Sequence, residues 1–306
     1  MILVAIIVVG ACGGAPTVPS ASLAPPPPPP TAAPSPPAPP PPTPEPTHPP
    51  RPASWTLVWG DDFDQPAGTV PDPAVWGYAL GDGTTSGLTG WGNNERQWYT
   101  DDPVHASTDG EGHLVISATV ADGSQACYYG PCEYESARLL TQDRFEVQYG
   151  RIEIVATVPA GFGLWPAFWM LGTNIDEVGW PQAGEVDIME YVGRWPNDVF
   201  GSLHGPGYSG GSAYTKTVTL DRPVAEGPHE FAIEWAPGSI AWYLDGERYH
   251  EALPSDVAPD EWVFDQPFYL ILNLAVGGNL AGPVFPDTVF PARLVVDHIR
   301  VYEAGP

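Results

Sequence analysis

Hydrophobic and polar residues alternate with a period of two along most of the chain after Trp55. The pattern is clearest in residues 113–120, 150–158 and 229–236, where every second side chain is apolar. Alternate side chains of a β-strand point to the same face, so this period predicts half-buried strands. The side chains predicted to face a core in these segments are Leu114, Ile116, Ala118, Val120, Ile152, Ile154, Ala156, Val158, Phe231, Ile233 and Trp235.

The remaining apolar segments predict strands of other kinds. Residues 239–250 contain Asp245-Gly246 between two short runs, which is typical of a β-hairpin. Residues 267–278 are apolar up to Asn273, as expected for a strand covered on both faces, and residues 294–303 form the last strand. No window of ten or more residues shows a helical period. We therefore predict one all-β domain, a jelly-roll sandwich of two antiparallel sheets.

The first 53 residues have a different composition. Residues 1–12 are apolar and have the length of a signal-peptide core, too short to span a bilayer. The sequence "VGAC", ending at Cys12, resembles the lipobox of bacterial lipoproteins, in which the Cys is lipidated after cleavage. Export with a lipid on Cys12, plain secretion and an unprocessed anchor all remain open. Residues 13–53 are rich in proline and predict an extended, disordered linker before a domain at 54–306.

The charge and the cysteine content of the chain exclude some classes of function. The chain has 37 acidic residues against 11 basic ones, a net charge of −26. This balance excludes a nucleic-acid binder that works through a basic patch. Cys127 and Cys132 enclose four residues and could form a small disulfide in an exported protein. We expect no zinc site there, because no further Cys or nearby His completes a ligand set.

Three carboxylates lie close together in "GEVDIMEYVG", residues 184–193. In a regular strand Glu185 and Asp187 share one face, whereas Glu190 points to the other. A β-bulge at Ile188-Met189 would reset the alternation and place all three acids on one surface. A curved, concave sheet would then bring the two glutamates together over a bound chain.

Two carboxylates on either side of one bond are what glycoside hydrolysis requires. One attacks the anomeric carbon, and the other protonates the departing oxygen and later activates water. Neighbouring like charges also separate the pKa values of the acids and keep one carboxyl protonated. The alternative is a row of solvent-facing acids on an amphipathic strand. Three nearby indoles, Trp165, Trp169 and Trp180, favour a sugar site, because flat aromatic rings bind the C–H faces of sugars.

The chain also resembles a known protein family. "GWPQAGEVDIMEYVG" (179–193) is similar to the signature E-x-D-x-x-E of glycoside hydrolase family 16 in its bulged, laminarinase-like form. The similarity covers residues 55–303. Further matching segments, in the same order, are "LVWGDDFDQP" (57–66), "GWGNNERQWYT" (90–100), "ESARLLTQDRFEVQYGRIE" (135–153), "WPAFWMLG" (165–172), "GSLHGPGYSG" (201–210), "FYLILNLAVGG" (268–278) and "VDHIRVYE" (296–303).

The resemblance implies a concave-faced jelly roll that cleaves internal β-1,3-glucosidic bonds with retention of configuration. By position, Glu185 would be the nucleophile, Glu190 the general acid/base and Asp187 the auxiliary acid between them. The residues implied to contact sugar are Asn94, Arg138, Trp165, Trp169, Trp180, His204 and Asn273. Asn94 would lie on the non-reducing side. A surface ion pair is the alternative for Arg138, and a structural role in a Gly-rich loop is the alternative for His204.

The resemblance implies no cofactor for catalysis but one structural Ca²⁺ away from the cleft. Its ligands would be Asp62, the carbonyl of Gly112, and Asp297. The sequence adds one argument of its own. Asp297 has the parity of Val295 and Ile299, so it should face the apolar side, where a buried carboxylate needs a cation.

Two other functions remain to be weighed. The chain could be a non-catalytic β-glucan-binding module of the same fold, although such relatives lack the catalytic glutamates. It could also cleave another polysaccharide, such as mixed-linkage β-1,3-1,4-glucan or the galactan agarose. In each case we expect an extracellular or cell-surface monomer with a polysaccharide partner and no nucleic acid, attached to a membrane through Cys12 if that residue is lipidated.

Overall fold

The computed structural model describes residue 52 and residues 54–305. The predicted export segment 1–12, the lipidation site Cys12 and nearly all of the predicted linker lie outside the described residues. Among the described residues, no helix is long and apolar enough to cross a membrane.

Two antiparallel sheets form the domain. The larger has ten strands: the path β17-β16-β15-β10-β19-β5-β8-β3, with β1 beside β19 and β4 beside β5. Its only parallel pair is β3 with β8. The strand bounds are β1 (Trp55–Asp61), β3 (Gln97–Tyr99), β4 (Ala106–Thr108), β5 (Leu114–Val120), β8 (Tyr134–Ser136), β10 (Gly150–Thr157), β15 (His229–Ala236), β16 (Ser239–Leu244), β17 (Glu247–Ala252) and β19 (Ala292–Ala304).

The second sheet has seven strands in the order β14-β13-β12-β11-β18-β9-β2. The strand bounds are β2 (Gly77–Tyr78), β9 (Arg138–Leu140), β11 (Leu164–Gly172), β12 (Glu185–Glu190), β13 (Asp198–His204), β14 (Tyr214–Thr219) and β18 (Phe268–Val276). A separate two-stranded ribbon consists of β6 (Ala126–Cys127) and β7 (Gly130–Pro131).

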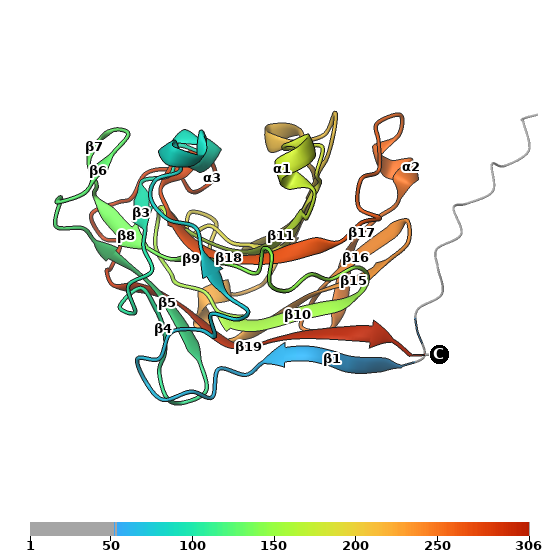
Figure 1. Cartoon of the computed structure of the whole chain (residues 1–306), viewed down its shortest axis with the longest axis horizontal. Coiled ribbons are helices and arrows are strands. Elements are labelled where there is room, and N and C mark those ends of the chain that lie inside the picture. The colour runs from blue at the N-terminus through green and yellow to red at the C-terminus, as the bar shows by residue number, and fades with distance from the viewer. Residues whose placement is uncertain (1–51, 53, 306) are drawn as a thin grey trace, which may run out of the picture. The chain divides into compact units, whose positions relative to one another are not determined.

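The described helices are all short, in agreement with the absence of a helical period. Figure 1 shows α1, α3 and the β6–β7 ribbon above the seven-stranded sheet, on the side away from the ten-stranded sheet. We call that side of the seven-stranded sheet its outer face. The helix bounds are α1 (Ile175–Val178), α2 (Pro254–Val257), α3 (Gly278–Ala281) and the 3₁₀ helices η1 (Thr84–Ser86), η2 (Thr89–Gly92), η3 (Gly210–Ser212) and η4 (Val224–Glu226).

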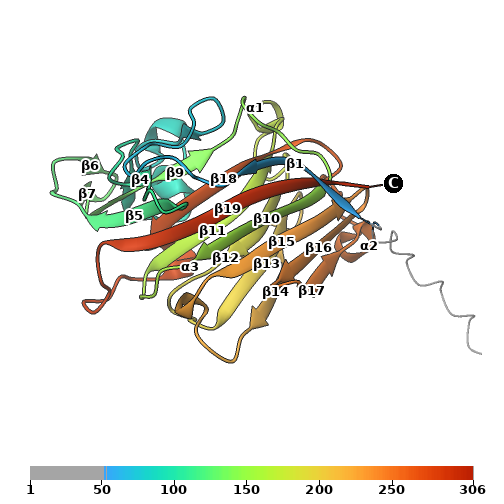
Figure 2. The ribbon, with the colours of Figure 1, turned by 90° about the horizontal axis from the view of Figure 1, so that it is seen from below.

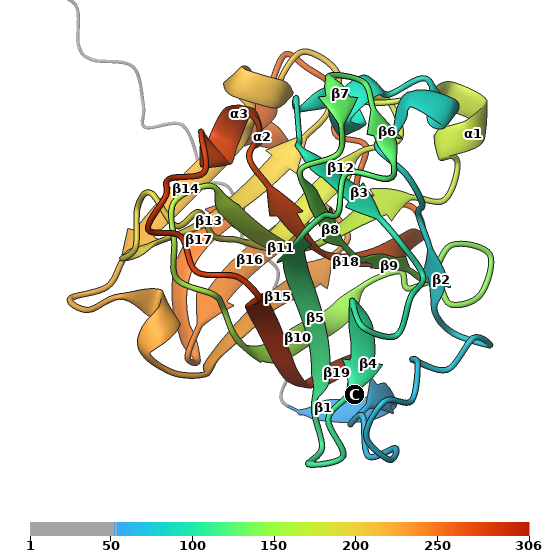
Figure 3. The ribbon, with the colours of Figure 1, turned by 90° about the vertical axis from the view of Figure 1, so that its left-hand side faces the viewer.

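The core lies between the two sheets. Figure 2 shows the opposite side of the sandwich, where β1, β19, β10 and β15 run next to one another, and Figure 3 shows the end formed by β4, β5 and β8. Side chains of alternate residues from both sheets pack in one cluster, as the period of two predicts. Of the side chains predicted to face the core, all except Val120 are buried. Val120 ends β5 and is 65% exposed, because the core does not reach the end of that strand.

The other predictions about strands are also confirmed. Asp245-Gly246 joins β16 to β17, and both residues have positive φ, as a tight two-residue hairpin turn requires. All nine residues of β18 are buried. The jelly-roll sandwich of two antiparallel sheets is therefore the fold of this domain.

The expectation that Asp297 is buried is wrong. In β19, Val155 pairs with His298 but the next residue, Ala156, pairs with Val296, so Asp297 occupies a bulge. The bulge makes Val296 and Ile299 the buried residues and leaves the Asp297 side chain 53% exposed. This carboxylate therefore does not need a cation on account of burial.

Candidate active site

A β-bulge places three acids on the outer face of the seven-stranded sheet. Met189 pairs with Phe168 of β11 and Asp187 pairs with Trp169, so Ile188 has no partner in β11. Both Ile188 and Met189 point into the core, each at most 1% exposed. Two successive inward residues reset the alternation, as predicted, and Glu190 shares the outer face with Glu185 and Asp187.

A tryptophan from the other sheet stabilises this bulge. The indole Nε1 of Trp242, on β16, donates a hydrogen bond of 2.8 Å to the backbone oxygen of Asp187. Trp242 reaches β12 by passing close to Gly201 of β13, where a Cβ atom would lie 2.6 Å from the indole ring. A bulge disrupts the ladder of backbone hydrogen bonds, so this donor supplies a partner that the sheet does not.

We expect Trp242→Phe to lower the free energy of unfolding by about 1–3 kcal/mol, because the buried carbonyl of Asp187 loses its donor. We also expect kcat to fall, because the bulge sets the position of Glu190. Trp235→Phe is the matched control, since Trp235 donates an equally buried hydrogen bond to the backbone of Phe264, away from the acids. Thermal unfolding and kinetics below the transition should show both variants destabilised but only Trp242→Phe slower. Equal kcat values would contradict this role.

Each glutamate has an indole as its hydrogen-bond donor. Trp180 Nε1 donates to Glu185 at 3.0 Å, and Trp165 Nε1 donates to Glu190 at 3.0 Å. The Nε2 atom of His204, the partner of Glu185 in β13, lies 3.1 Å from Asp187 Oδ2 and 3.6 Å from Glu185 Oε1. His204 is therefore an ion-pair partner of these acids.

Burial and mutual repulsion change the protonation of this cluster. Burial, and secondly the charge of Asp187, raises the pKa of Glu185 to about 7 and that of Glu190 well above its usual range. Burial alone would lower the pKa of His204, but the nearby charges of Glu185 and Asp187 outweigh it and raise that pKa to about 10. The imidazole is therefore cationic at neutral pH, beside Glu185, whose carboxyl holds its proton more strongly than usual.

The pH dependence of kcat/KM should follow from these pKa values. Glu185 must lose its proton to act as a nucleophile, and Glu190 must keep its proton to act as an acid. We expect kcat/KM to fall about tenfold per pH unit below about pH 7 and to fall again at alkaline pH, when Glu190 ionises. Initial rates at fixed ionic strength from pH 4 to 10 test this. An acid limb that lies near pH 4 would show that burial does not raise the pKa of Glu185.

Among the described residues, one group has the composition of a metal site: Glu185, Asp187 and His204, whose ligand atoms lie within 4.8 Å of one another. A metal needs a neutral imidazole, whereas the raised pKa of His204 favours the cation. The charge of the acids is thus balanced by His204 itself, and the arrangement suits an ion pair rather than a bound metal.

On the β11 side of the acids, aromatic rings enclose a cation. The Arg138 guanidinium carbon lies 4.6 Å from the ring centre of Trp91 and 4.7 Å from that of Trp169. Arg138 pairs with Asn273 across β9 and β18, and Trp169 Nε1 donates to Asn273 Oδ1 at 2.8 Å. Arg138 is thus held between two indoles on the outer face and is not a solvent-exposed ion pair.

A buried polar network fixes Asn273 from below. Asn273 Nδ2 donates to the Tyr99 hydroxyl at 3.1 Å, and that hydroxyl donates to Glu95 Oε2 at 3.3 Å. Gln97 Nε2 donates to the same Glu95 oxygen at 2.7 Å, while Gln97 Oε1 accepts from the backbone of Val276 at 2.7 Å. The amide of Asn273 therefore has a defined orientation, which a sugar-binding group requires.

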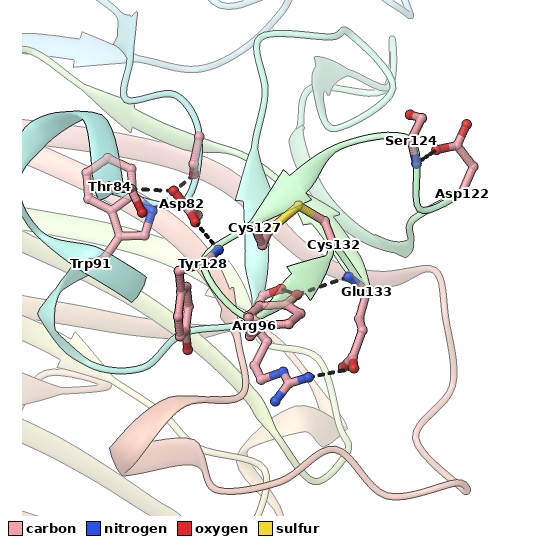
Figure 4. Close-up of a disulfide and its surroundings, with 12 residues drawn as sticks. Asp82, Thr84, Trp91, Arg96, Asp122, Ser124, Cys127, Tyr128, Cys132 and Glu133 are labelled. Carbon is pink, nitrogen blue, oxygen red and sulfur yellow. Dashed lines mark hydrogen bonds and ion pairs between the residues drawn. A yellow bond between two sulfur atoms is a disulfide. The ribbon is translucent and has the colours of Figure 1, made fainter.

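The β6–β7 ribbon borders this side of the site (Figure 4). The Cys127–Cys132 disulfide closes it, as the sequence suggested. Its Tyr128 amide donates to Asp82 at 2.7 Å, and Arg96 forms an ion pair with Glu133, the residue that follows Cys132. These contacts hold the ribbon against the loop that carries Trp91, which is also drawn in Figure 4.

The predicted sugar-contacting residues come together to different degrees. Trp165, Trp180 and His204 contact the acids directly, and Arg138, Trp169 and Asn273 form the neighbouring group described above. Asn94 is exposed, and none of the described hydrogen bonds joins it to the acids. Its Nδ2 atom donates to Asn279 Oδ1 of α3 at 2.8 Å.

Four residues around Arg138 and Asn273 were not predicted: Trp91, Glu95, Gln97 and Tyr99. All four lie in "GWGNNERQWYT", which carried part of the resemblance. Their proximity to Asn273 depends on a pairing with residues about 180 positions away, which the sequence pattern does not contain. The alternation of polar and aromatic residues there was the one available signal.

The residues predicted to bind calcium lie elsewhere. Asp62 is exposed and pairs with Arg300 at 2.8 Å, and Asp297 pairs with His298. Gly112 lies beside the loop that follows β1, since a Cβ on it would be 3.6 Å from Asp64 Oδ1. Arg300 therefore already supplies positive charge to Asp62.

Comparisons with known proteins agree with this geometry. The family model described as "Glycosyl hydrolases family 16" matches residues 93–284. A β-glucanase of Rhodothermus marinus is 40% identical over 264 residues, which cover 81% of this chain and 85% of that protein. The laminarinase catalytic domain of Thermotoga maritima MSB8 aligns with a TM-score of 0.78 and 45% identity, covering 82% of this chain and 99% of that one. An endo-β-1,3-glucanase of Pyrococcus furiosus aligns with a TM-score of 0.78 and 42% identity, covering 82% and 96%.

Proposed function

This chain belongs to glycosyl hydrolase family 16, and on that premise we propose that it is an endo-acting β-1,3-glucanase that cleaves β-glucans with retention. The observation that carries the proposal is the bulge at Ile188-Met189, which brings Glu190 to the face that holds Glu185. A glucan-binding module of this fold would have no need of this pair. Their presence therefore favours the enzyme.

We assign the first chemical step to Glu185 and Glu190. A Glu185 oxygen attacks the anomeric carbon and forms a glycosyl ester, while Glu190 gives its proton to the departing glycosidic oxygen. The Trp180 N–H orients Glu185, and the Trp165 N–H orients Glu190. In the second step Glu190 takes a proton from water, which attacks the same carbon and releases Glu185. No cofactor takes part in this chemistry.

Asp187 and His204 support these steps without reacting. Burial, and secondly the charge of Asp187, raises the pKa of Glu190, which keeps the acid protonated until it is needed. The His204 imidazolium lies between Asp187 and Glu185 and offsets part of their negative charge, so that Glu185 can ionise. Arg138 and Asn273 are proposed to bind hydroxyl groups of the sugar that becomes attached to Glu185, on the non-reducing side where the family resemblance places Asn94.

A product profile tests the substrate class. We expect purified protein to release oligosaccharides of several lengths from laminarin and to act more slowly on lichenan, a mixed-linkage glucan. Agarose should be left intact. Chromatography of the products from equal enzyme amounts gives the comparison. Cleavage of agarose with laminarin unchanged would move the chain to a galactan-cleaving function.

A structural Ca²⁺ ion bound by Asp62, the Gly112 carbonyl and Asp297 remains a prediction of the family resemblance. The donors are oxygen atoms, which Ca²⁺ prefers, but the ion would have to take the place of Arg300 beside Asp62. We expect a chelator to lower the melting temperature by a few degrees and added Ca²⁺ to restore it. Asp62→Asn should remove this response. An unchanged melting temperature in the wild type would argue against the ion.

We also propose that the protein is exported, because an enzyme that cleaves polymeric β-glucan must reach this substrate outside the cell. The lipobox-like sequence before Cys12 supports attachment to a membrane. Cell fractionation of the wild type and Cys12→Ala tests it. The wild type should remain with membranes and the variant should be soluble; equal distribution would exclude a lipid anchor at this residue.

A further inference from the structure

An exposed indole lies on the other side of Glu190 from Arg138. Trp195, in the connection between β12 and β13, is 40% exposed. Its backbone nitrogen donates to Val192, and its carbonyl accepts from Asp198, so the residue sits in a tight turn.

Two neighbours hold the ring of Trp195 in place. The guanidinium carbon of Arg194 lies 3.9 Å from the ring centre, and the Nε atom of Arg194 is buried without a hydrogen-bond partner among the described residues. On the other side, the Phe200 ring lies 5.7 Å away, centre to centre. Phe200 is the partner of Glu190 in the β12–β13 pair. Trp195 thus packs against the residue directly opposite the acid.

The backbone contacts show on which side of β12 the turn lies. Pro196 O accepts from Val224 N, and Asn197 O accepts from Leu220 N, both at 2.8 Å. Residues 220–224 follow β14, at the far edge of the sheet from β9. The second half of the turn therefore lies beside β13 and β14, while Gly193 at its start donates to Leu164 O of β11. Arg138 and Asn273 lie on β9 and β18.

The outer face of β13 has two charged or titratable side chains, Asp198 and His204. It carries Phe200 and the hydroxyl pair Ser202–Thr215, in which Thr215 donates to Ser202 at 2.9 Å. A sugar that binds here would find hydroxyl groups and an aromatic ring. The opposite side offers a guanidinium and an oriented amide. The two halves of the site thus differ in chemistry. A guanidinium between two indoles and an oriented amide lie on one side, and hydroxyl groups with an aromatic ring lie on the other.

We propose that Trp195, held by Arg194, is a stacking platform for a glucose unit on the leaving-group side of the cleaved bond. The inference rests on the proposed function, in which the sugar on the side of Arg138 and Asn273 becomes attached to Glu185. The leaving group then extends over β13 and β14 and reaches Trp195. The indole contacts the C–H face of the ring and reads no particular hydroxyl group.

The test compares two substrates in Trp195→Ala and Trp195→Phe. Laminarihexaose places glucose units on both sides of the cleaved bond, whereas an aryl β-laminaribioside has only a phenol on the leaving-group side. We expect Trp195→Ala to lower kcat/KM for the hexaose by about 3- to 10-fold and to change that for the aryl glycoside by less than twofold. Trp195→Phe should retain most of the activity on the hexaose. Leu57→Ala, which truncates an exposed side chain of β1 in the other sheet, is the control.

A second readout uses the glycosyl ester itself. With aryl β-laminaribioside as donor and added laminaribiose as acceptor, Trp195→Ala should form less transfer product relative to hydrolysis than the wild type. An equal loss on both substrates would show that Trp195 is structural, and an unchanged kcat/KM for the hexaose would show that no glucose binds there. Either result overturns the proposal. A wild type that cleaves neither substrate would instead refute the proposed function.

Discussion

Glu185→Gln is expected to lower kcat on laminarin by at least about 1,000-fold, or about 4 kcal/mol of transition-state stabilisation. The amide cannot form the glycosyl ester, but it has nearly the shape of the carboxyl group and can still accept from the Trp180 N–H. Glucan binding should therefore remain. Rates from reducing-end release and affinity from calorimetry with laminarihexaose give the two values.

A control variant and two alternative outcomes show how the Glu185→Gln result is to be interpreted. Glu177→Gln, an exposed acid in α1 with no contact to the acids among the described interactions, should retain wild-type rates. Wild-type hydrolysis by Glu185→Gln would refute the nucleophile assignment. Loss of both activity and binding, together with a lower melting temperature, would point to a structural carboxylate instead.

Glu190→Ala should have a different signature. Without its acid the enzyme should lose about 10²- to 10⁴-fold on laminarin, whose leaving group needs a proton. An aryl laminaribioside with a good leaving group should still form the Glu185 ester, but hydrolysis of that ester should stall because no base activates water. Azide needs no base, so it should displace Glu185 and restore turnover.

The product of this rescue is informative in its own right. Azide attacks the anomeric carbon from the face that the leaving group vacated, so two inversions give a β-glycosyl azide. Proton NMR of the product identifies its configuration. An α-glycosyl azide would mean that azide took the place of Glu185, and an absence of rescue would remove Glu190 from the role of acid/base.

Much of the fold follows from the period of two, because each sheet has one face in the core. That rule also predicted the bulge in β12, since the three acids conflicted with regular alternation and their functional grouping required an extra residue. The bulge at Asp297 cannot be predicted in the same way. Val295 and Val296 are both apolar, so the sequence does not show which of them faces the core, and a regular alternation counted from Val295 wrongly buries Asp297.

The site was predictable only where its residues are close in sequence or lie in matching motifs. Glu185, Asp187 and Glu190 occupy one strand. In contrast, the hydrogen bond between Tyr99 and Asn273 joins residues 174 positions apart, and the one from Trp242 to Asp187 joins the two sheets. Trp195 gave no signal at all, because a single exposed indole in a turn has no periodicity. Its position becomes meaningful only beside Phe200 and Glu190.

The most direct test of the central claim is to trap the glycosyl ester. A 2-deoxy-2-fluoro-β-laminaribiosyl fluoride should inactivate the enzyme and accumulate as an ester, because the fluorine slows its hydrolysis. Mass spectrometry of the peptides should place one added laminaribiosyl group on Glu185. A label on Glu190, or an enzyme that remains active and unlabelled, would contradict the assignment of the two glutamates that the bulge brings together.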